Sequence, residues 1–209
     1  MNTLFKQSLA IGVLSAMFAG TTMAAPTETP PAFVKRVADN LIVRLKKDHN
    51  KLQNNPAAIR SVVEDELLEH IDSAAFARNV LGQYARQSTP AQRKQFETNL
   101  RETLIKNYGS AFAKFTNQTY KMRPYKTPAN PKLPEVTIDF INKTDRIPVT
   151  FQLTESGNTW KIRNLQVSGV EIGLQFRNQF ANTVKRNGND LDKAIANFKP
   201  DVEKAVEKK

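Results

Sequence analysis

The sequence predicts an α+β fold in which helices pack around a twisted four-stranded antiparallel sheet. Apolar residues recur at helical spacing through the first half of the chain, up to about residue 116. From about residue 120 the apolar period falls to two, which is typical of strands with one buried face. The segment Ser156-Gly157-Asn158 separates the last two strand-like runs and predicts a turn between antiparallel neighbours.

The first 24 residues predict a cleavable secretory signal. Lys6 precedes an apolar run from Leu9 to Ala19, and small residues end the segment at Ala24. The apolar run is too short for a membrane span, which needs about 20 residues. Residues 25–209 are therefore expected to be exported and to form a single domain.

The whole chain carries a net charge of +11 and contains no cysteine. Lys6 is the only charged residue of the predicted signal, so the exported part would keep nearly all of this excess. Without cysteine there is no disulfide framework and no site for lipid attachment, and the core alone must stabilise the domain. An exported chain does not meet the genome, so we expect no nucleic-acid partner. Anionic lipid head groups or acidic protein surfaces fit the charge better.

Two amphipathic helices are expected first. Apolar residues at every fourth position from Phe33 to Leu45 predict the first helix, whose other face is basic. Asn55-Pro56 predicts the start of the second helix, because Asn caps well and Pro is favoured in the first turn. Its apolar positions continue to Ile71.

Two further helices precede the sheet. The third is expected over residues 73–81 and ends at Gly82. The fourth is expected over residues 90–116, because Thr89 and Gln92 can form a capping box ahead of large apolar residues at helical spacing.

The four strands are defined by alternating apolar residues. These are Tyr120 and Met122, then Val136, Ile138 and Phe140, then Val149, Phe151 and Leu153, and finally Trp160 and Ile162. Arg163 and Asn164 interrupt the alternation before Leu165, which predicts a β-bulge. After a turn at Gly169 the spacing becomes helical, and a last helix is expected over residues 191–198 before a frayed, charged tail.

Residues suited to catalysis are scarce. The two histidines, His49 and His70, lie at expected helix ends and are predicted to be exposed, and no thiol or metal-ligating cluster accompanies them. Asp139 alternates with Ile138 and Phe140, so we expect it on the polar, solvent-facing side of the sheet. Glu171 is the other acidic candidate. The residues alone thus offer no convincing catalytic site, and they do not identify a function.

Five segments together resemble one family. VLGQYARQSTPAQRKQF (80–96) resembles the MlaC or toluene-tolerance family, periplasmic phospholipid carriers of the maintenance-of-lipid-asymmetry pathway. NNPAAIRSVVEDELL (54–68), NYGSAFAKFTNQTY (107–120) and NTWKI (158–162) resemble further segments of that family. Gly169-Val170 matches its Gly-Val-Ser motif, with Glu171 in place of Ser.

The resemblance implies a non-enzymatic carrier located in the periplasm. Helices and the sheet would enclose an apolar pocket for the acyl chains of a phospholipid, held as cargo and not as a cofactor, with the head group outside. The implied partners are an outer-membrane lipoprotein–porin complex and an inner-membrane ATP-driven transporter complex. The carrier is expected to be a monomer and to bind no metal.

The resemblance also suggests which apolar residues form the pocket wall. Val170, Ile172, Leu174 and Phe176 alternate after the Gly169 turn and would form one part of it. The other expected lipid contacts are Leu81, Tyr84, Phe96, Leu100, Leu104, Tyr108, Phe112, Ile138, Phe140, Val149, Phe151, Trp160, Ile162 and Val167.

Two other functions stay open at this point. A periplasmic chaperone, or a binding protein for other apolar cargo, would use the same apolar surface but would bind unfolded protein. A small isomerase or hydrolase would depend on Asp139 or Glu171 as a base.

Overall fold

The structure is a computed structural model that describes residues 25–52, 55–113, 119–141 and 145–207. For residues 107–113 and 200–207 the backbone alone is described. The predicted signal, residues 1–24, lies outside the described residues.

Seven α-helices and two 3₁₀ turns lie in the described part of the chain. Their bounds are α1 (Pro30–Lys47), α2 (His49–Leu52), α3 (Pro56–Glu66), η1 (Leu68–His70), α4 (Ser73–Leu81), η2 (Gly82–Ala85), α5 (Pro90–Ala113), α6 (Ile172–Arg186) and α7 (Leu191–Glu207). The four helices expected before the sheet are confirmed in type and start, but α3 ends at Glu66 and a 3₁₀ turn replaces the helix that was expected to continue to Ile71. Residues 114–116 of the fourth expected helix lie outside the described residues. Helix α7 continues through most of the tail that was expected to fray.

Local capping explains where several helices begin. The Asn55 side chain accepts a hydrogen bond from the Ala58 N–H at 3.1 Å at the start of α3. At α5 the Thr89 hydroxyl accepts from the Gln92 N–H at 3.2 Å, and the Gln92 side chain accepts from the Thr89 N–H at 2.9 Å. This reciprocal pair is the predicted capping box.

The sheet is an antiparallel meander of five strands in the order β1-β2-β3-β4-β5. The strands are β1 (Thr119–Met122), β2 (Glu135–Ile141), β3 (Arg146–Ser156), β4 (Thr159–Val167) and β5 (Val170–Glu171). The register shifts so that Gln152 pairs with Asn164 and Leu153 with Ile162, which confirms the bulge at Arg163. The fifth, very short strand was not predicted. It forms because Ser168 and Gly169 both adopt positive φ, 50° and 84°, and turn the chain back on β4.

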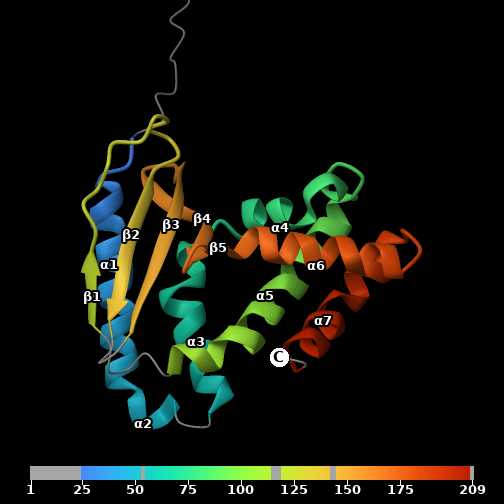
Figure 1. Cartoon of the computed structure of the whole chain (residues 1–209), viewed down its shortest axis with the longest axis horizontal. Coiled ribbons are helices and arrows are strands. Elements are labelled where there is room, and N and C mark those ends of the chain that lie inside the picture. Colours follow the sequence, from blue (N-terminus) through green and yellow to red (C-terminus); the bar gives the residue numbers. More distant parts are fainter. Residues whose placement is uncertain (1–24, 53–54, 114–118, 142–144, 208–209) are drawn as a thin grey trace, which may run out of the picture.

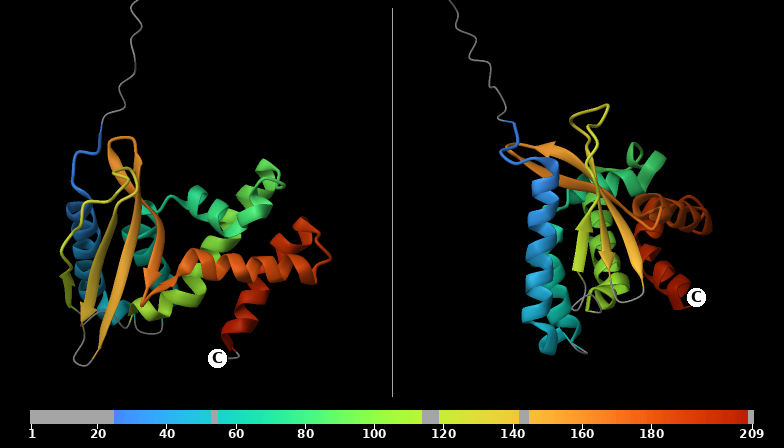
Figure 2. Two further views of the ribbon diagram at one scale, coloured as in Figure 1. Left: turned by 45° about the horizontal axis from the view of Figure 1, so that its top comes forward. Right: turned by 60° about the vertical axis from the view of Figure 1, so that its left-hand side comes forward.

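The molecule has two main packing regions. Helix α1 covers the apolar face of the sheet, whereas α4, α5, α6 and α7 gather beside the β4–β5 edge (Figures 1 and 2). One apolar cluster joins α1 to the sheet through residues such as Phe33 and Ile138. A second cluster joins α4, α5, α6 and α7 through residues such as Phe96 and Phe180. Ile71 packs against both clusters, so the segment between α3 and α4 links the two regions.

Asp139 differs from its predicted environment. It lies opposite Ile138 and Phe140 as expected, but it is 3% exposed and not solvent-facing. The Arg123 guanidinium covers it, with nitrogen–oxygen distances of 2.7 to 3.1 Å, and Arg146 lies 3.6 Å away. The hydrogen bonds from Arg123 lower the pKa of the Asp139 carboxyl.

The predicted exposure of the histidines is also wrong. The His70 side chain is 13% exposed and packs edge-to-face on Phe33, with ring centroids 5.8 Å apart. Burial lowers its pKa. His49 is half-buried at the start of α2.

Candidate functional site

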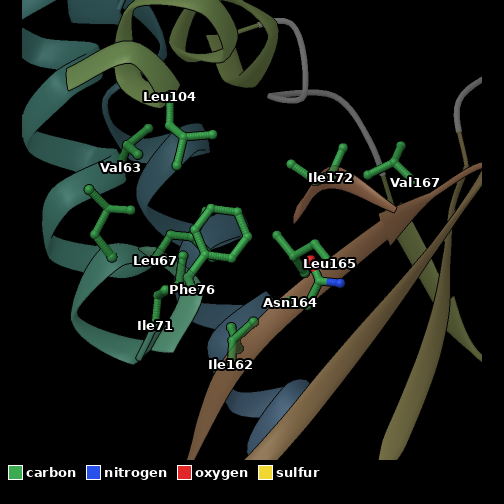
Figure 3. Close-up of a pocket in the computed structure, with 11 residues that line it drawn as sticks. Val63, Leu67, Ile71, Phe76, Leu104, Ile162, Asn164, Leu165, Val167 and Ile172 are labelled. Atoms are coloured by element: carbon green, nitrogen blue, oxygen red, sulfur yellow. The ribbon is translucent and has the colours of Figure 1, made fainter. Parts of the chain in front are cut away.

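An apolar cavity of about 200 Å³ lies where α3, α4, α5, the start of α6 and strand β4 meet. Figure 3 shows side chains from these elements pointing into the same space. The lining residues are Val63, Leu67, Leu68, Ile71, Phe76, Leu104, Ile162, Asn164, Leu165, Val167 and Ile172. All but Asn164 are apolar, so the site can take an apolar ligand and offers it very little hydrogen bonding.

The Asn164 amide already has partners in the protein. Its Nδ2 donates to the Gln152 side chain at 3.0 Å, and its Oδ1 accepts from the Gly173 N–H at 3.1 Å. The second bond serves one of the N–H groups at the start of α6 that have no partner within the helix. Because Glu171, the preceding N-cap residue, makes no side-chain cap, Asn164 of β4 fixes where α6 begins.

Close packing at Gly173 keeps α6 against the cavity. A Cβ atom there would lie 2.6 Å from Asn79 Nδ2 and 2.9 Å from Asn164 Oδ1, which is shorter than real contacts allow. Glycine therefore lets the first turn of α6 approach α4 and β4 closely. This approach places Ile172 in the cavity wall.

The cavity is poorly suited to acid–base chemistry. None of its lining residues titrates. Asp139 belongs to the opposite face of the sheet, and its lowered pKa is the reverse of what a catalytic base needs at neutral pH. Glu171 accepts from Gln152 at 3.2 Å and does not line the cavity. Among the described residues there is no cluster of His, Asp or Glu that could hold a metal ion.

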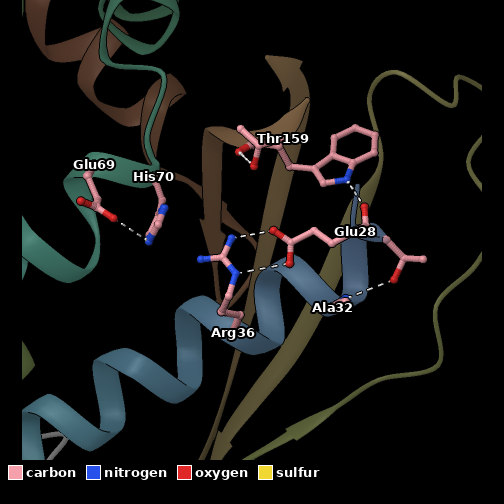
Figure 4. Close-up of polar contacts among 8 residues, drawn as sticks. Glu28, Ala32, Arg36, Glu69, His70 and Thr159 are labelled. Atoms are coloured by element: carbon pink, nitrogen blue, oxygen red, sulfur yellow. Dashed lines mark hydrogen bonds and ion pairs between the residues drawn. The ribbon is translucent and has the colours of Figure 1, made fainter. Parts of the chain in front are cut away.

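A polar cluster at the other end of the sheet also has its groups paired. The Arg36 guanidinium binds the Glu28 carboxylate with distances of 2.6 and 3.3 Å, and the Trp160 indole donates to the Glu28 carbonyl at 2.9 Å. His70 lies 3.3 Å from Glu69 in the same region (Figure 4). These contacts tie the start of α1 to the sheet, and we assign them a structural role.

The eighteen residues expected to contact lipid fall into several groups. Four line the cavity: Leu104, Ile162, Val167 and Ile172. Five belong to the α1–sheet cluster, Ile138, Phe140, Val149, Phe151 and Trp160, and five to the helical cluster, Leu81, Tyr84, Phe96, Leu100 and Phe176. The side chains of Tyr108 and Phe112 lie outside the described residues. The remaining two, Val170 and Leu174, are 52% and 44% exposed.

The strand-like alternation expected from Val170 to Phe176 is wrong, because α6 begins at Ile172. In a helix, residues 172 and 176 lie on one face and residue 174 points away from it, so the three cannot form one wall. Ile172 faces the cavity, Leu174 faces outward and Phe176 packs among the helices.

Seven lining residues were not among those expected. They are Val63, Leu67, Leu68, Ile71, Phe76, Asn164 and Leu165. Nothing in the local sequence marks them as lining a cavity instead of filling a core.

Three comparisons identify similar proteins. The chain is 33% identical to the toluene tolerance protein ttg2D of Pseudomonas putida over 195 residues, covering 92% of this chain and 89% of that protein. It is 23% identical to the intermembrane phospholipid transport system binding protein MlaC of Haemophilus influenzae over 164 residues, covering 77% and 76%. A structure of a phospholipid-binding protein from Ralstonia solanacearum in complex with a phospholipid superimposes with a TM-score of 0.76 at 22% identity, covering 83% of this chain and 96% of that one.

The model of the family described as MlaC protein matches residues 35–199. This range includes every residue that lines the cavity, and the relative from Pseudomonas putida is similar over nearly the whole chain. The chain therefore belongs to the MlaC family.

Proposed function

We propose that the protein is a periplasmic phospholipid carrier that holds acyl chains in the cavity and leaves the head group outside. The apolar lining of the cavity is the observation that carries this proposal, because it can replace a hydrocarbon environment but offers no reacting group. The relative from Haemophilus influenzae is a phospholipid transport binding protein, and the Ralstonia solanacearum protein holds a phospholipid.

Transfer energetics favour a passive carrier. Burying one methylene contributes about 0.8 kcal/mol, so about 30 methylenes in two acyl chains contribute on the order of 24 kcal/mol relative to water. Free phospholipid in water is therefore scarce, and the carrier must take lipid from a membrane or a partner. Exchange between bilayer and cavity changes the free energy little, so partner complexes would impose the direction.

The cavity must widen to hold a phospholipid. Its volume of about 200 Å³ is below the roughly 300–1,000 Å³ of sites for drug-sized ligands. The walls come from both packing regions, the sheet through Ile162 and the helices through Phe76 and Leu104. Separation of these regions would enlarge the cavity without unfolding either apolar cluster.

The expected location and partners complete the proposal. Residues 1–24 would direct export and be removed, leaving residues 25–209 as the carrier. None of the helices in the described part combines the length and hydropathy that a membrane crossing requires. The carrier would exchange lipid with an outer-membrane lipoprotein–porin complex and with an inner-membrane ATP-driven transporter. Exposed Lys46 and Lys47 on α1 are available to meet acidic surfaces.

The test is native mass spectrometry of the exported protein, followed by solvent extraction and lipid analysis. We expect phospholipid at a fixed molar ratio. Ile172→Glu should remove most of it, because a carboxylate in the apolar cavity would be desolvated without a partner. Leu174→Glu is the matched control two residues along, where the side chain is exposed and lipid content should be unchanged.

Melting temperatures of both variants would show whether they fold. An Ile172→Glu protein that folds and keeps its full lipid content would contradict the assignment of the cavity. A wild-type protein that carries no lipid, fails to take it from vesicles and binds unfolded polypeptide would favour the chaperone function.

A further inference from the structure

A second concave site, polar in character, lies outside the apolar cavity. It is a groove of about 570 Å³ between α4, η2 and α6. Its polar lining includes Arg78, Asn79, Gln83, Arg177 and Asn178. Two guanidinium groups thus share one groove that no carboxylate lines.

Arg177 is held in a fixed position in this groove. Its Nε donates to the Asn79 carbonyl oxygen at 2.7 Å, and one terminal nitrogen donates to the Asn79 side-chain oxygen. Gly82, with a φ of 57°, leaves room for the arginine stem, because a Cβ there would lie 3.0 Å from Arg177 Cδ. Asn79 and Gly82, close together at the end of α4 and the start of η2, therefore fix the Arg177 guanidinium of the distant α6 before any ligand arrives, which lowers the entropic cost of binding.

The charge of the groove is not neutralised. Neither Arg78 nor Arg177 makes an ion pair with any residue in the described ranges, although most arginines near α1 and α3 do. A guanidinium has five N–H donors, and Arg177 uses two of them on Asn79. The remaining donors, with those of exposed Arg78, are free to bind an anion.

We propose that this groove binds a phosphate group, with Arg177 as the fixed contact and Arg78 as a mobile one. Guanidinium groups match the geometry of phosphate oxygens and form strong charge-assisted hydrogen bonds with them. The phosphate belongs either to a phospholipid head group or to a free phosphate ion.

The position of the groove is compatible with a lipid source. Ile172 lines the apolar cavity and Arg177 lines the groove, so the two sites share α6, on which these two residues lie about 7.5 Å apart along the helix axis. The assignment of the phosphate to a lipid head group rests on the proposed function, whereas binding of free phosphate does not.

The experiment compares two probes on the exported protein. Inorganic phosphate is titrated by ³¹P NMR, and monomeric dihexanoylphosphatidylglycerol is titrated by calorimetry. Arg78→Gln removes an exposed donor and should weaken binding about tenfold, the loss of one hydrogen bond to a charged group. Arg177→Gln should weaken it more. Arg86→Gln is the control, because Arg86 is exposed beyond η2 and does not line the groove.

The results of these titrations distinguish a phospholipid head group from free phosphate as the ligand of the groove. Weaker binding of the lipid probe in Arg78→Gln supports the head-group source, and weaker binding of inorganic phosphate alone supports a site for free phosphate. Unchanged affinity for both probes in Arg78→Gln and Arg177→Gln, or equal losses in Arg86→Gln, overturns the proposal. Native mass spectrometry on the same samples tests the carrier separately. Lipid bound in the cavity, with neither probe affected by Arg78→Gln or Arg177→Gln, refutes the groove and leaves the carrier standing.

Discussion

Replacing Gly173 by alanine should destabilise the protein, although helix propensity alone predicts the opposite. Alanine is favoured over glycine by about 1 kcal/mol in a helix interior. At Gly173, however, the new Cβ would lie 2.6 Å from Asn79 Nδ2 and 2.9 Å from Asn164 Oδ1. Both side chains would have to move, although Asn79 holds Arg177 and Asn164 holds the Gly173 N–H.

The size of the effect follows from the bonds that move. Two hydrogen bonds contribute about 1 kcal/mol each, and overpacking of a tight site costs about 1–3 kcal/mol. After subtraction of the propensity gain, the free energy of unfolding should fall by about 2–4 kcal/mol. For a domain of this size that corresponds to a decrease in melting temperature of roughly 4–16 °C.

Differential scanning calorimetry would measure the change. Asn182→Ala is the control, because Asn182 is exposed on the same helix and should gain stability from propensity alone. In an Asn164→Ala background Gly173→Ala should cost less, since one of its two clashes is gone. If Gly173→Ala raises the melting temperature as Asn182→Ala does, the argument for close packing at the start of α6 is refuted.

Three further predictions concern the cavity and two buried titratable residues. Val63→Phe should fill part of the cavity, raise the melting temperature by a few degrees and lower the co-purifying lipid; more lipid would contradict the site. The lowered pKa of His70 means that the unfolded chain binds the proton more readily, so the free energy of unfolding should decrease as the pH drops below about 6.5. Calorimetry between pH 7 and 5 should show a smaller decrease in melting temperature for His70→Gln than for the wild type, and an equal decrease would refute this. The lowered pKa of Asp139 stabilises the fold above about pH 4, so Asp139→Asn should lower the melting temperature at pH 7, by an amount that shrinks as the pH falls below about 4. A difference that does not depend on pH would exclude the charge as its cause.

The ends of elements were predictable from the sequence where nearby residues set them. Asn55 and the Thr89–Gln92 box act on backbone groups three residues away, and these bonds appear where they were expected. The bulge at Arg163 was predictable for a similar reason, because a slip of one residue in the apolar alternation is visible along a single strand.

The start of α6 was not predictable in this way. The Gly173 N–H in its first turn donates to the side chain of Asn164, nine residues earlier on β4, and the adjacent residue Glu171 makes no side-chain cap. The burial of Asp139 was not predictable from the local sequence either, because the side chain that covers it belongs to Arg123, sixteen residues earlier in the chain. Such contacts depend on the relative placement of elements, which alternation within one segment does not encode.

The sequence by itself determined the α+β class, the antiparallel order, the capped helix starts, the excess of positive charge and the likeness to a lipid-carrier family. Only the tertiary structure decided which apolar residues surround a cavity, because a side chain that fills a core and one that borders a void follow the same period. The distinction depends on the volume left between α3, α4, α5, α6 and β4, and that volume is a property of all five elements together.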